Sequence, residues 1–123
     1  MDKQPLTGMA RMITAYRNSM VGLRDIWRGE EAFRIEAVLC ALSVPVALWI
    51  GEDFFQAAIL FGAGLLLIIV EVINSAIEAT IDRIGPERHE LSRMAKDLGS
   101  LAVLLATVLL GILWLAALID KFA

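Results

Sequence analysis

The stretch FFQAAILFGAGLLLIIV, residues 54–70, contains 17 residues without a charged side chain. It continues directly into EVINSAIEATIDR, residues 71–83, which carries Glu71, Asn74 and Glu78. The apolar run predicts a helix that crosses a membrane. The polar segment predicts that the same helix leaves the membrane with acidic and amide side chains on one face. Together the two segments indicate a membrane helix that ends in a functional site.

Two further apolar stretches, 37–51 and 98–119, also lack Asp, Glu, Lys and Arg. The second has 22 residues, enough to cross a hydrocarbon core of about 30 Å at about 1.5 Å per residue. A soluble chain of 123 residues that is 59% hydrophobic could not bury this much apolar surface. The sequence therefore predicts an all-α integral membrane protein, residues 1–123 as one domain, with spans at about 31–50, 54–83 and 91–120.

An amphipathic helix is expected before the first span, at about residues 7–28. Its apolar residues recur at helical spacing, while arginines occupy the other faces. Such a helix lies on a membrane surface with its arginines near anionic headgroups, and the adjoining spans favour this interpretation over a calmodulin-type partner helix. The apolar positions are Met9, Met12, Ile13, Tyr16, Met20, Leu23 and Trp27.

The basic residues predict the orientation in the membrane. Ten of them lie before the first span or between the second and third, and only Lys121 lies at the other side. Basic residues mark cytoplasmic loops, so the N-terminus is expected in the cytoplasm and the C-terminus on the opposite side of the membrane. The ten are Lys3, Arg11, Arg17, Arg24, Arg28, Arg34, Arg83, Arg88, Arg93 and Lys96.

The polar face of the second span is the candidate site. At 100° per residue, positions 71, 74, 75, 78 and 82 form one stripe, which holds Glu71, Asn74, Ser75, Glu78 and Asp82. An ionisable group in a membrane helix costs about 2.5–3.5 kcal/mol on insertion scales and usually serves a function. Carboxylates suit Mg²⁺ with substrate phosphates, and one of them could take a proton from a hydroxyl. This favours phosphoryl transfer to a lipid alcohol, with a structural interhelical ion pair as the alternative.

A nucleotide-binding loop of the usual kind is absent from the sequence. No GxxxxGK[ST] motif occurs, and Gly62 and Gly64 lie inside an apolar run, where small residues favour contact between helices. No nucleic-acid partner is expected.

Three segments of the sequence resemble the motifs of a known family. EVINSAIEATIDR (71–83), HELSRMAKDLGS (89–100) and RGEEAFRIE (28–36) resemble the motifs of the prokaryotic integral-membrane diacylglycerol kinases. The resemblance implies ATP-dependent phosphorylation of the primary hydroxyl of diacylglycerol, to give phosphatidic acid, at the cytoplasmic face of the bacterial inner membrane. It also implies Mg²⁺ and a homotrimer whose sites are shared between neighbouring chains.

The same resemblance implies roles for individual residues. Glu71 would be the general base, Asn74 would orient it or a phosphate, and Glu30 and Glu78 would hold Mg²⁺ on the ATP phosphates. The ATP-binding residues would be Arg11, Asn18, Glu30, Glu78, Glu87, His89, Lys96 and Asp97. The lipid substrate would meet Ser19, Arg24, Trp49, Glu71, Ser100 and Trp114. A helix-capping role for His89 is an equal alternative.

Two other functions are compatible with parts of the sequence. An undecaprenol kinase of the same family shares the motif, and the long surface helix favours diacylglycerol over it. A small proton-coupled transporter would also place an acid in the membrane, but it would need that acid near the midplane with access from both sides. The acids here gather toward one end beside a basic loop, which favours the kinase.

Overall fold

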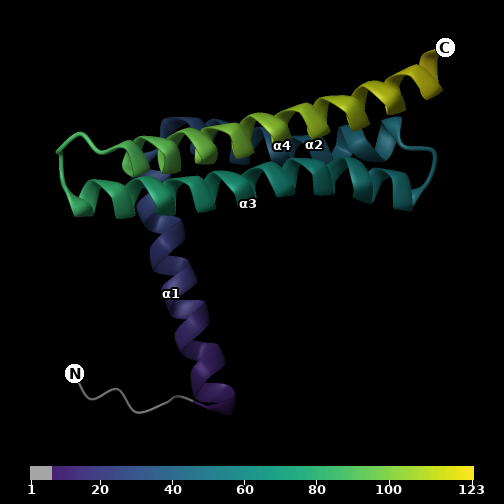
Figure 1. The fold of residues 1–123 in the computed structure, drawn as a ribbon. Coiled ribbons are helices and arrows are strands. Elements are labelled where there is room, and N and C mark those ends of the chain that lie inside the picture. The colour runs from purple at the N-terminus through teal and green to yellow at the C-terminus, as the bar shows by residue number, and fades with distance from the viewer. Residues whose placement is uncertain (1–6) are drawn as a thin grey trace. The chain divides into compact units, whose positions relative to one another are not determined.

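The computed structural model describes residues 7–123 and is entirely helical over that range (Figure 1). Lys3, one of the basic residues used to predict the orientation, lies outside the described residues. The helices are α1 (Gly8–Gly29), α2 (Glu31–Ile50), α3 (Phe54–Ile84) and α4 (Glu90–Phe122). The chain forms two compact units, one up to Glu31 and the other from Ala32 to Ala123.

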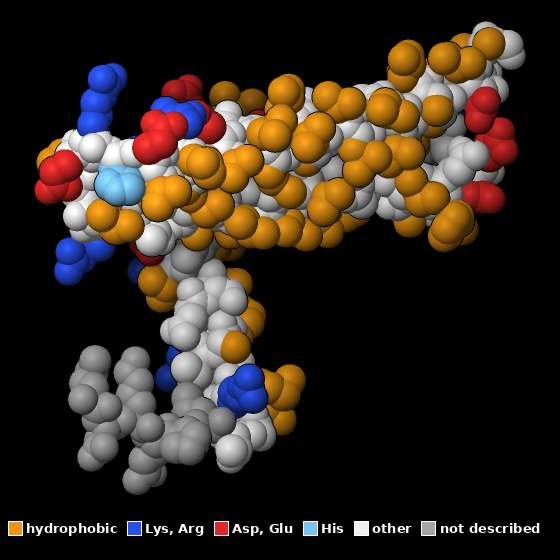
Figure 2. Space-filling view, in the orientation of Figure 1, with side chains coloured by type: hydrophobic (Ala, Val, Ile, Leu, Met, Phe, Trp, Pro, Cys, Tyr) orange, Lys and Arg blue, Asp and Glu red, His pale blue; other side chains and the backbone are white. Residues whose placement is uncertain are grey.

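Three of the four helices are long and apolar enough to cross a membrane: α2, α3 and α4. The prediction of an all-helical protein with three apolar spans is therefore confirmed. Figure 2 shows hydrophobic side chains along the visible face of these helices and charged side chains gathered toward their two ends. This distribution is typical of helices surrounded by lipid along their length and by water at their ends.

A tight turn joins α2 to α3. Asp53 caps α3, because its carboxylate accepts a hydrogen bond of 2.8 Å from the backbone N–H of Gln56. The Gln56 side chain in turn accepts one of 3.0 Å from the N–H of Glu52. A Cβ at Gly51 would lie 2.8 Å from the Ala57 nitrogen, so only glycine fits at this crossing. The turn reverses the direction of the chain, so that α3 runs antiparallel to α2 (Figure 1).

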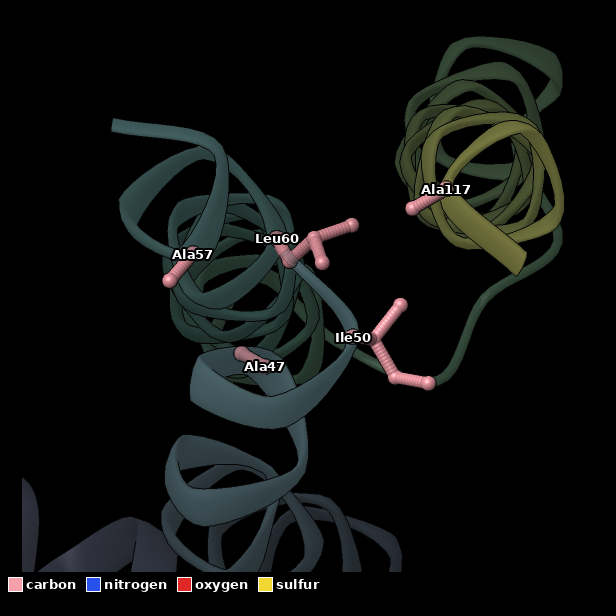
Figure 3. Close-up of a cluster of buried hydrophobic side chains, with 5 residues drawn as sticks. All are labelled: Ala47, Ile50, Ala57, Leu60 and Ala117. Atoms are coloured by element: carbon pink, nitrogen blue, oxygen red, sulfur yellow. The ribbon is translucent and has the colours of Figure 1, made fainter. Parts of the chain in front are cut away.

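Five buried side chains join the three helices at this same end of the bundle. Ala47 and Ile50 come from α2, Ala57 and Leu60 from α3, and Ala117 from α4. Ile50 and Leu60 point into the space that Ala117 faces (Figure 3). Their small and branched side chains allow the backbones to approach, as is usual where membrane helices pack.

The other connection, between α3 and α4, ends α3 at a glycine. Gly85 has φ of 146°, a conformation that L side chains rarely adopt, and its N–H donates to the carbonyl of Ile81 at 3.3 Å. His89 then caps α4, with Nδ1 accepting a hydrogen bond of 3.1 Å from the N–H of Leu91. The short loop makes α3 and α4 antiparallel neighbours, and they run side by side (Figure 1).

Candidate active site

The polar stripe of α3 is ordered by a hydrogen bond along the helix. The Asn74 side-chain amide donates to Glu78 Oε1 at 3.2 Å, one turn further on. Glu71 lies about one turn before Asn74 and interacts electrostatically with Glu78. The three side chains predicted to carry the chemistry thus share one half-buried face of one helix.

A fourth polar residue, Glu36 of α2, faces this stripe. Its carboxyl group lies close enough to that of Glu71 for the two to interact electrostatically. The sequence-based prediction did not include Glu36 among the site residues. A signal was present, since Glu36 is the last charged residue before the uncharged stretch 37–51 and therefore belongs to the beginning of a membrane helix.

Two side-chain oxygens at this site are buried without a hydrogen-bond partner among the described residues. They are Oε2 of Glu36 and Oδ1 of Asn74. A buried acceptor without a donor is uncommon in proteins and calls for an explanation. The Glu36 oxygen could accept a hydrogen bond from a bound molecule, and together with the polar stripe of α3 it makes this end of the bundle the candidate active site.

Asn74 is confined on its other side by α4. A Cβ built on the buried Gly99 would overlap Asn74 Oδ1. Glycine is therefore required at position 99 for the two helices to approach while Asn74 keeps its place. Gly99 is a second residue that the sequence-based prediction did not identify.

Charged side chains surround the end of the bundle next to the site. Lys96 of α4 forms an ion pair of 3.2 Å with Asp82 of α3. Arg93 pairs with both Glu90 and Asp97 on its own helix. Lys96 and Asp97, two of the predicted ATP-binding residues, are thus exposed, and each forms an ion pair within the protein. A bound nucleotide would have to replace these ion pairs or share them.

The predicted residues of the connecting loop have defined positions. Glu87 is exposed and folds back over Gly85, where an added Cβ would lie 2.6 Å from a carboxylate oxygen. His89 is exposed, and its Nδ1 is used as the helix cap of α4. The capping role that the sequence offered as an alternative for His89 is therefore present, and its Nε2 remains for other contacts.

The predicted lipid-binding residues of the bundle are dispersed along its length. Ser100 is exposed on α4 near Gly99. Trp114 is half-buried, and its indole N–H donates to the Leu60 carbonyl at 3.2 Å, so it joins α4 to α3. Trp49 is 61% exposed at the opposite end and lies edge-on to Phe122 at 5.8 Å. The structure therefore brings Glu71, Asn74 and Glu78 together. Trp49 and Trp114 lie farther along the helices, away from these three residues.

The remaining predicted residues belong to the first unit. Four of them lie on α1 and Glu30 follows its last residue, with the Glu30 N–H donating to the Ile26 carbonyl at 2.9 Å. The Ser19 hydroxyl donates to the Ala15 carbonyl at 2.8 Å, within the helix. The four α1 residues are Arg11, Asn18, Ser19 and Arg24.

Within residues 7–123 no group of three or more His, Cys, Asp or Glu side chains is gathered for a metal ion. Mg²⁺ needs fewer protein ligands than that, because it is commonly held by one or two carboxylates together with substrate phosphates and water. Glu78 fits this role chemically. Its Oε1 accepts the Asn74 amide, which orients the carboxylate and leaves Oε2 for a cation.

Residues 17–118 match the family model described as prokaryotic diacylglycerol kinase. The chain belongs to the prokaryotic diacylglycerol kinase family. It is 47% identical to the diacylglycerol kinase of Escherichia coli K12 over 116 residues, which cover 94% of this chain and 95% of that protein. It is 41% identical to the diacylglycerol kinase of Pseudomonas aeruginosa over 108 residues, 88% of each chain. The corresponding figure for the Haemophilus influenzae diacylglycerol kinase is 39% over 108 residues, 88% of this chain and 92% of the relative.

Membership of the prokaryotic diacylglycerol kinase family confirms the resemblance seen in the sequence, and with it the prediction of a lipid kinase. It explains why a nucleotide-binding loop of soluble kinases is missing, since this family is a separate, membrane-embedded type of kinase. The proton-coupled transporter is set aside by the same finding. The acids on α2 and α3 are therefore the natural place to look for the chemistry of phosphoryl transfer.

Proposed function

We propose that the chain transfers the γ-phosphoryl group of ATP to the primary hydroxyl of diacylglycerol, giving phosphatidic acid and ADP. The observation that carries the proposal is the face of α3 on which Glu71, Asn74 and Glu78 meet Glu36 of α2. It places carboxylates and an amide at the end of two apolar helices, where a lipid hydroxyl and a soluble nucleotide can both arrive. The names of the relatives support the same reaction.

Glu71 serves as the general base. It takes the proton of the lipid hydroxyl while the hydroxyl oxygen forms a bond to the γ-phosphorus, and the bond from that phosphorus to the β–γ bridging oxygen breaks. Asn74 donates to the Glu78 carboxylate and fixes it, while its own oxygen lies against Gly99 of α4. Correct placement of these groups is the main contribution that a protein makes to phosphoryl transfer.

Glu30 and Glu78 would hold Mg²⁺ on the phosphates of ATP, where the cation neutralises charge during transfer. The basic side chains of Arg11 and Lys96 bind the nucleotide, with Asn18, Glu87, His89 and Asp97 around it. Ser19, Arg24, Trp49, Ser100 and Trp114 contact the lipid.

The working enzyme is a homotrimer in the bacterial inner membrane, with α1 on the cytoplasmic surface and the C-terminus in the periplasm. A trimer would cover polar faces that three helices alone bury poorly. The excess of basic residues at one side of the membrane supports this orientation.

An assay in mixed micelles tests the proposed reaction. Purified protein is given labelled ATP with diacylglycerol or with undecaprenol, each with and without Mg²⁺. We expect labelled phosphatidic acid that depends on Mg²⁺, and much less product from undecaprenol. Preferred labelling of undecaprenol would assign the chain to the alternative substrate, and no lipid product at all would overturn the proposal.

A further inference from the structure

Arg93 of α4 is a cation next to the candidate site to which the sequence-based prediction gave no part in the reaction. It lies three residues before Lys96 and four before Asp97, both of which are predicted to bind ATP. At 100° per residue these three residues share a face of α4 about 100° wide, and Ser100 continues that face toward the membrane. The Arg93 side chain is 56% exposed. It is therefore accessible to any molecule that binds Lys96 and Asp97.

Hydrogen bonds to two carboxylates hold the Arg93 side chain in place. Its Nη1 donates to Asp97 Oδ2 at 2.5 Å, its Nε donates to Glu90 Oε1 at 3.0 Å, and its Nη2 donates to the same Glu90 oxygen. Three of the five N–H groups of the guanidinium are thus used, and among residues 7–123 one on Nη1 and one on Nη2 remain without an acceptor. The group is oriented and still has donors for an anion.

The stability of α4 does not explain these ion pairs. Arg93 is in the first turn of the helix, where the helix dipole disfavours a cation. An acid followed by a base is the favourable order along a helix, so the pair with Glu90 helps, but the pair with Asp97 has the reverse order. Exposed ion pairs contribute little in either order. The main effect of the two pairs is therefore to fix the direction of the guanidinium.

The order of residues along α4 indicates which part of a nucleotide each would meet. Gly99 lies against Asn74 and so marks the level of the candidate site. Lys96 is three residues and Arg93 six residues farther toward the start of α4, which is about 4.5 Å and about 9 Å along the axis at about 1.5 Å per residue. The γ-phosphate has to reach the lipid hydroxyl at the level of the site. The other phosphates then extend past Lys96 toward Arg93.

We propose that Arg93 binds the non-transferred α- and β-phosphates of the nucleotide, while Lys96 lies nearer the γ-phosphate. The planar guanidinium fork matches two phosphate oxygens at once, whereas the ammonium group of a lysine acts as a point charge. A guanidinium already held by two carboxylates loses less freedom when it binds. The inference rests on the proposed function and adds a residue that binds the substrate ATP and the product ADP alike.

The first test measures nucleotide binding without turnover, in micelles with Mg²⁺ and no lipid substrate. Arg93→Gln should raise the Kd for ADP and for a non-hydrolysable ATP analogue by similar factors, about tenfold, because a charge-assisted hydrogen bond is lost from both. Arg93→Lys should restore only part of the affinity, since it returns the charge without the fork.

Arg83→Gln is the matched control for the first test. It removes an exposed arginine from the last turn of α3, beside the same loop, and should keep the wild-type Kd values. Wild-type ADP binding in Arg93→Gln, or an equal loss in Arg83→Gln, would overturn the proposal. The second of these results would mean that only the total charge at this end of the bundle matters.

A second test separates direct contact from an effect through Asp97. Arg93→Gln is introduced into an Asp97→Asn protein, in which the ion pair between the two residues is already absent. Direct contact with phosphate predicts that the double variant binds ADP about tenfold more weakly than Asp97→Asn alone. Equal Kd values for the single and the double variant would show that Arg93 only holds Asp97, and the proposal would fail.

Lipid phosphorylation gives a third readout. Arg93→Gln should raise KM for ATP and Ki for ADP by similar factors, with a much smaller effect on kcat, because the non-transferred phosphates are bound both before and during transfer. A fall in kcat with KM unchanged would contradict the proposal. Failure of the proposed function would instead appear as a wild-type protein that gives no lipid product, whatever its affinity for ADP.

Discussion

Asn74 Oδ1 lies directly against Gly99, so that a single added carbon on α4 would overlap an oxygen of the site on α3. The same Asn74 orients Glu78 through its amide nitrogen. The contact between two helices therefore sets the position of a side chain in the candidate site. Gly99, which has no side chain, thus helps to shape the candidate site through this contact.

Gly99→Ala should lower kcat strongly, because the added methyl group displaces Asn74 and with it Glu78. Misplacement of a catalytic group by about 1 Å can cost about 10²-fold in rate. The overpacking should also lower the free energy of unfolding, typically by about 1–3 kcal/mol. Steady-state kinetics and thermal unfolding in micelles measure the two effects. Gly62→Ala, where a Cβ meets open space, is the control and should change neither.

Glu71→Gln should nearly abolish turnover and leave ATP binding intact, since the amide keeps the shape of the side chain and removes the base. A general base is commonly worth about 10²–10⁴ in rate. The rate of lipid phosphorylation and the Kd for ATP are the measurements. Glu52→Gln, at an exposed carboxylate in the turn before α3, should retain wild-type activity. Activity above roughly a tenth of wild type in Glu71→Gln would remove Glu71 from this role.

Lys96 and Asp82 offer a way to separate a structural ion pair from a nucleotide contact. Both side chains are exposed, and such a pair contributes about 0–1 kcal/mol to stability. Asp82→Asn should therefore change stability and KM for ATP only slightly. Lys96→Met should raise KM for ATP about tenfold or more, because a charge-assisted hydrogen bond to phosphate is worth about 1.5–3 kcal/mol. Equal defects in the two variants would show that Lys96 acts through Asp82 and not on ATP.

The shared site of the proposed homotrimer can be tested by mixing inactive variants. If one chain supplies Glu30 and its neighbour supplies Glu71 and Glu78, then Glu30→Gln reconstituted with Glu78→Gln should recover part of the wild-type activity. A mixture of Glu71→Gln with Glu78→Gln is the control. It should stay inactive, since both residues lie on α3 of one chain. Recovery in the control mixture, or none in the first, would contradict this division of the site.

The sequence by itself determined the helices and the polar stripe of α3. Both depend on local properties: the length of uncharged segments, the glycine and cap residues that end a helix, and the period of 3.6 residues. Glu71, Asn74 and Glu78 could be placed on one face for that reason, and the structure has Asn74 bonded to Glu78. The limits of α4 differ from prediction by one residue at the start and two at the end, because His89 caps the helix one residue earlier and polar Asp120 and Lys121 remain helical.

Only the tertiary structure decided which helices meet at that stripe. Glu36 is 35 residues from Glu71 in the sequence, and Gly99 is 25 from Asn74, so no local pattern connects them. Neither residue is unusual for its own helix, since Glu36 begins a span and Gly99 is one of nine glycines. Their roles arise from antiparallel packing of α2, α3 and α4, which sets a carboxyl group against another and a glycine against an amide. Helix formation follows from neighbours in the chain, while the site follows from how side-chain volumes fit between helices.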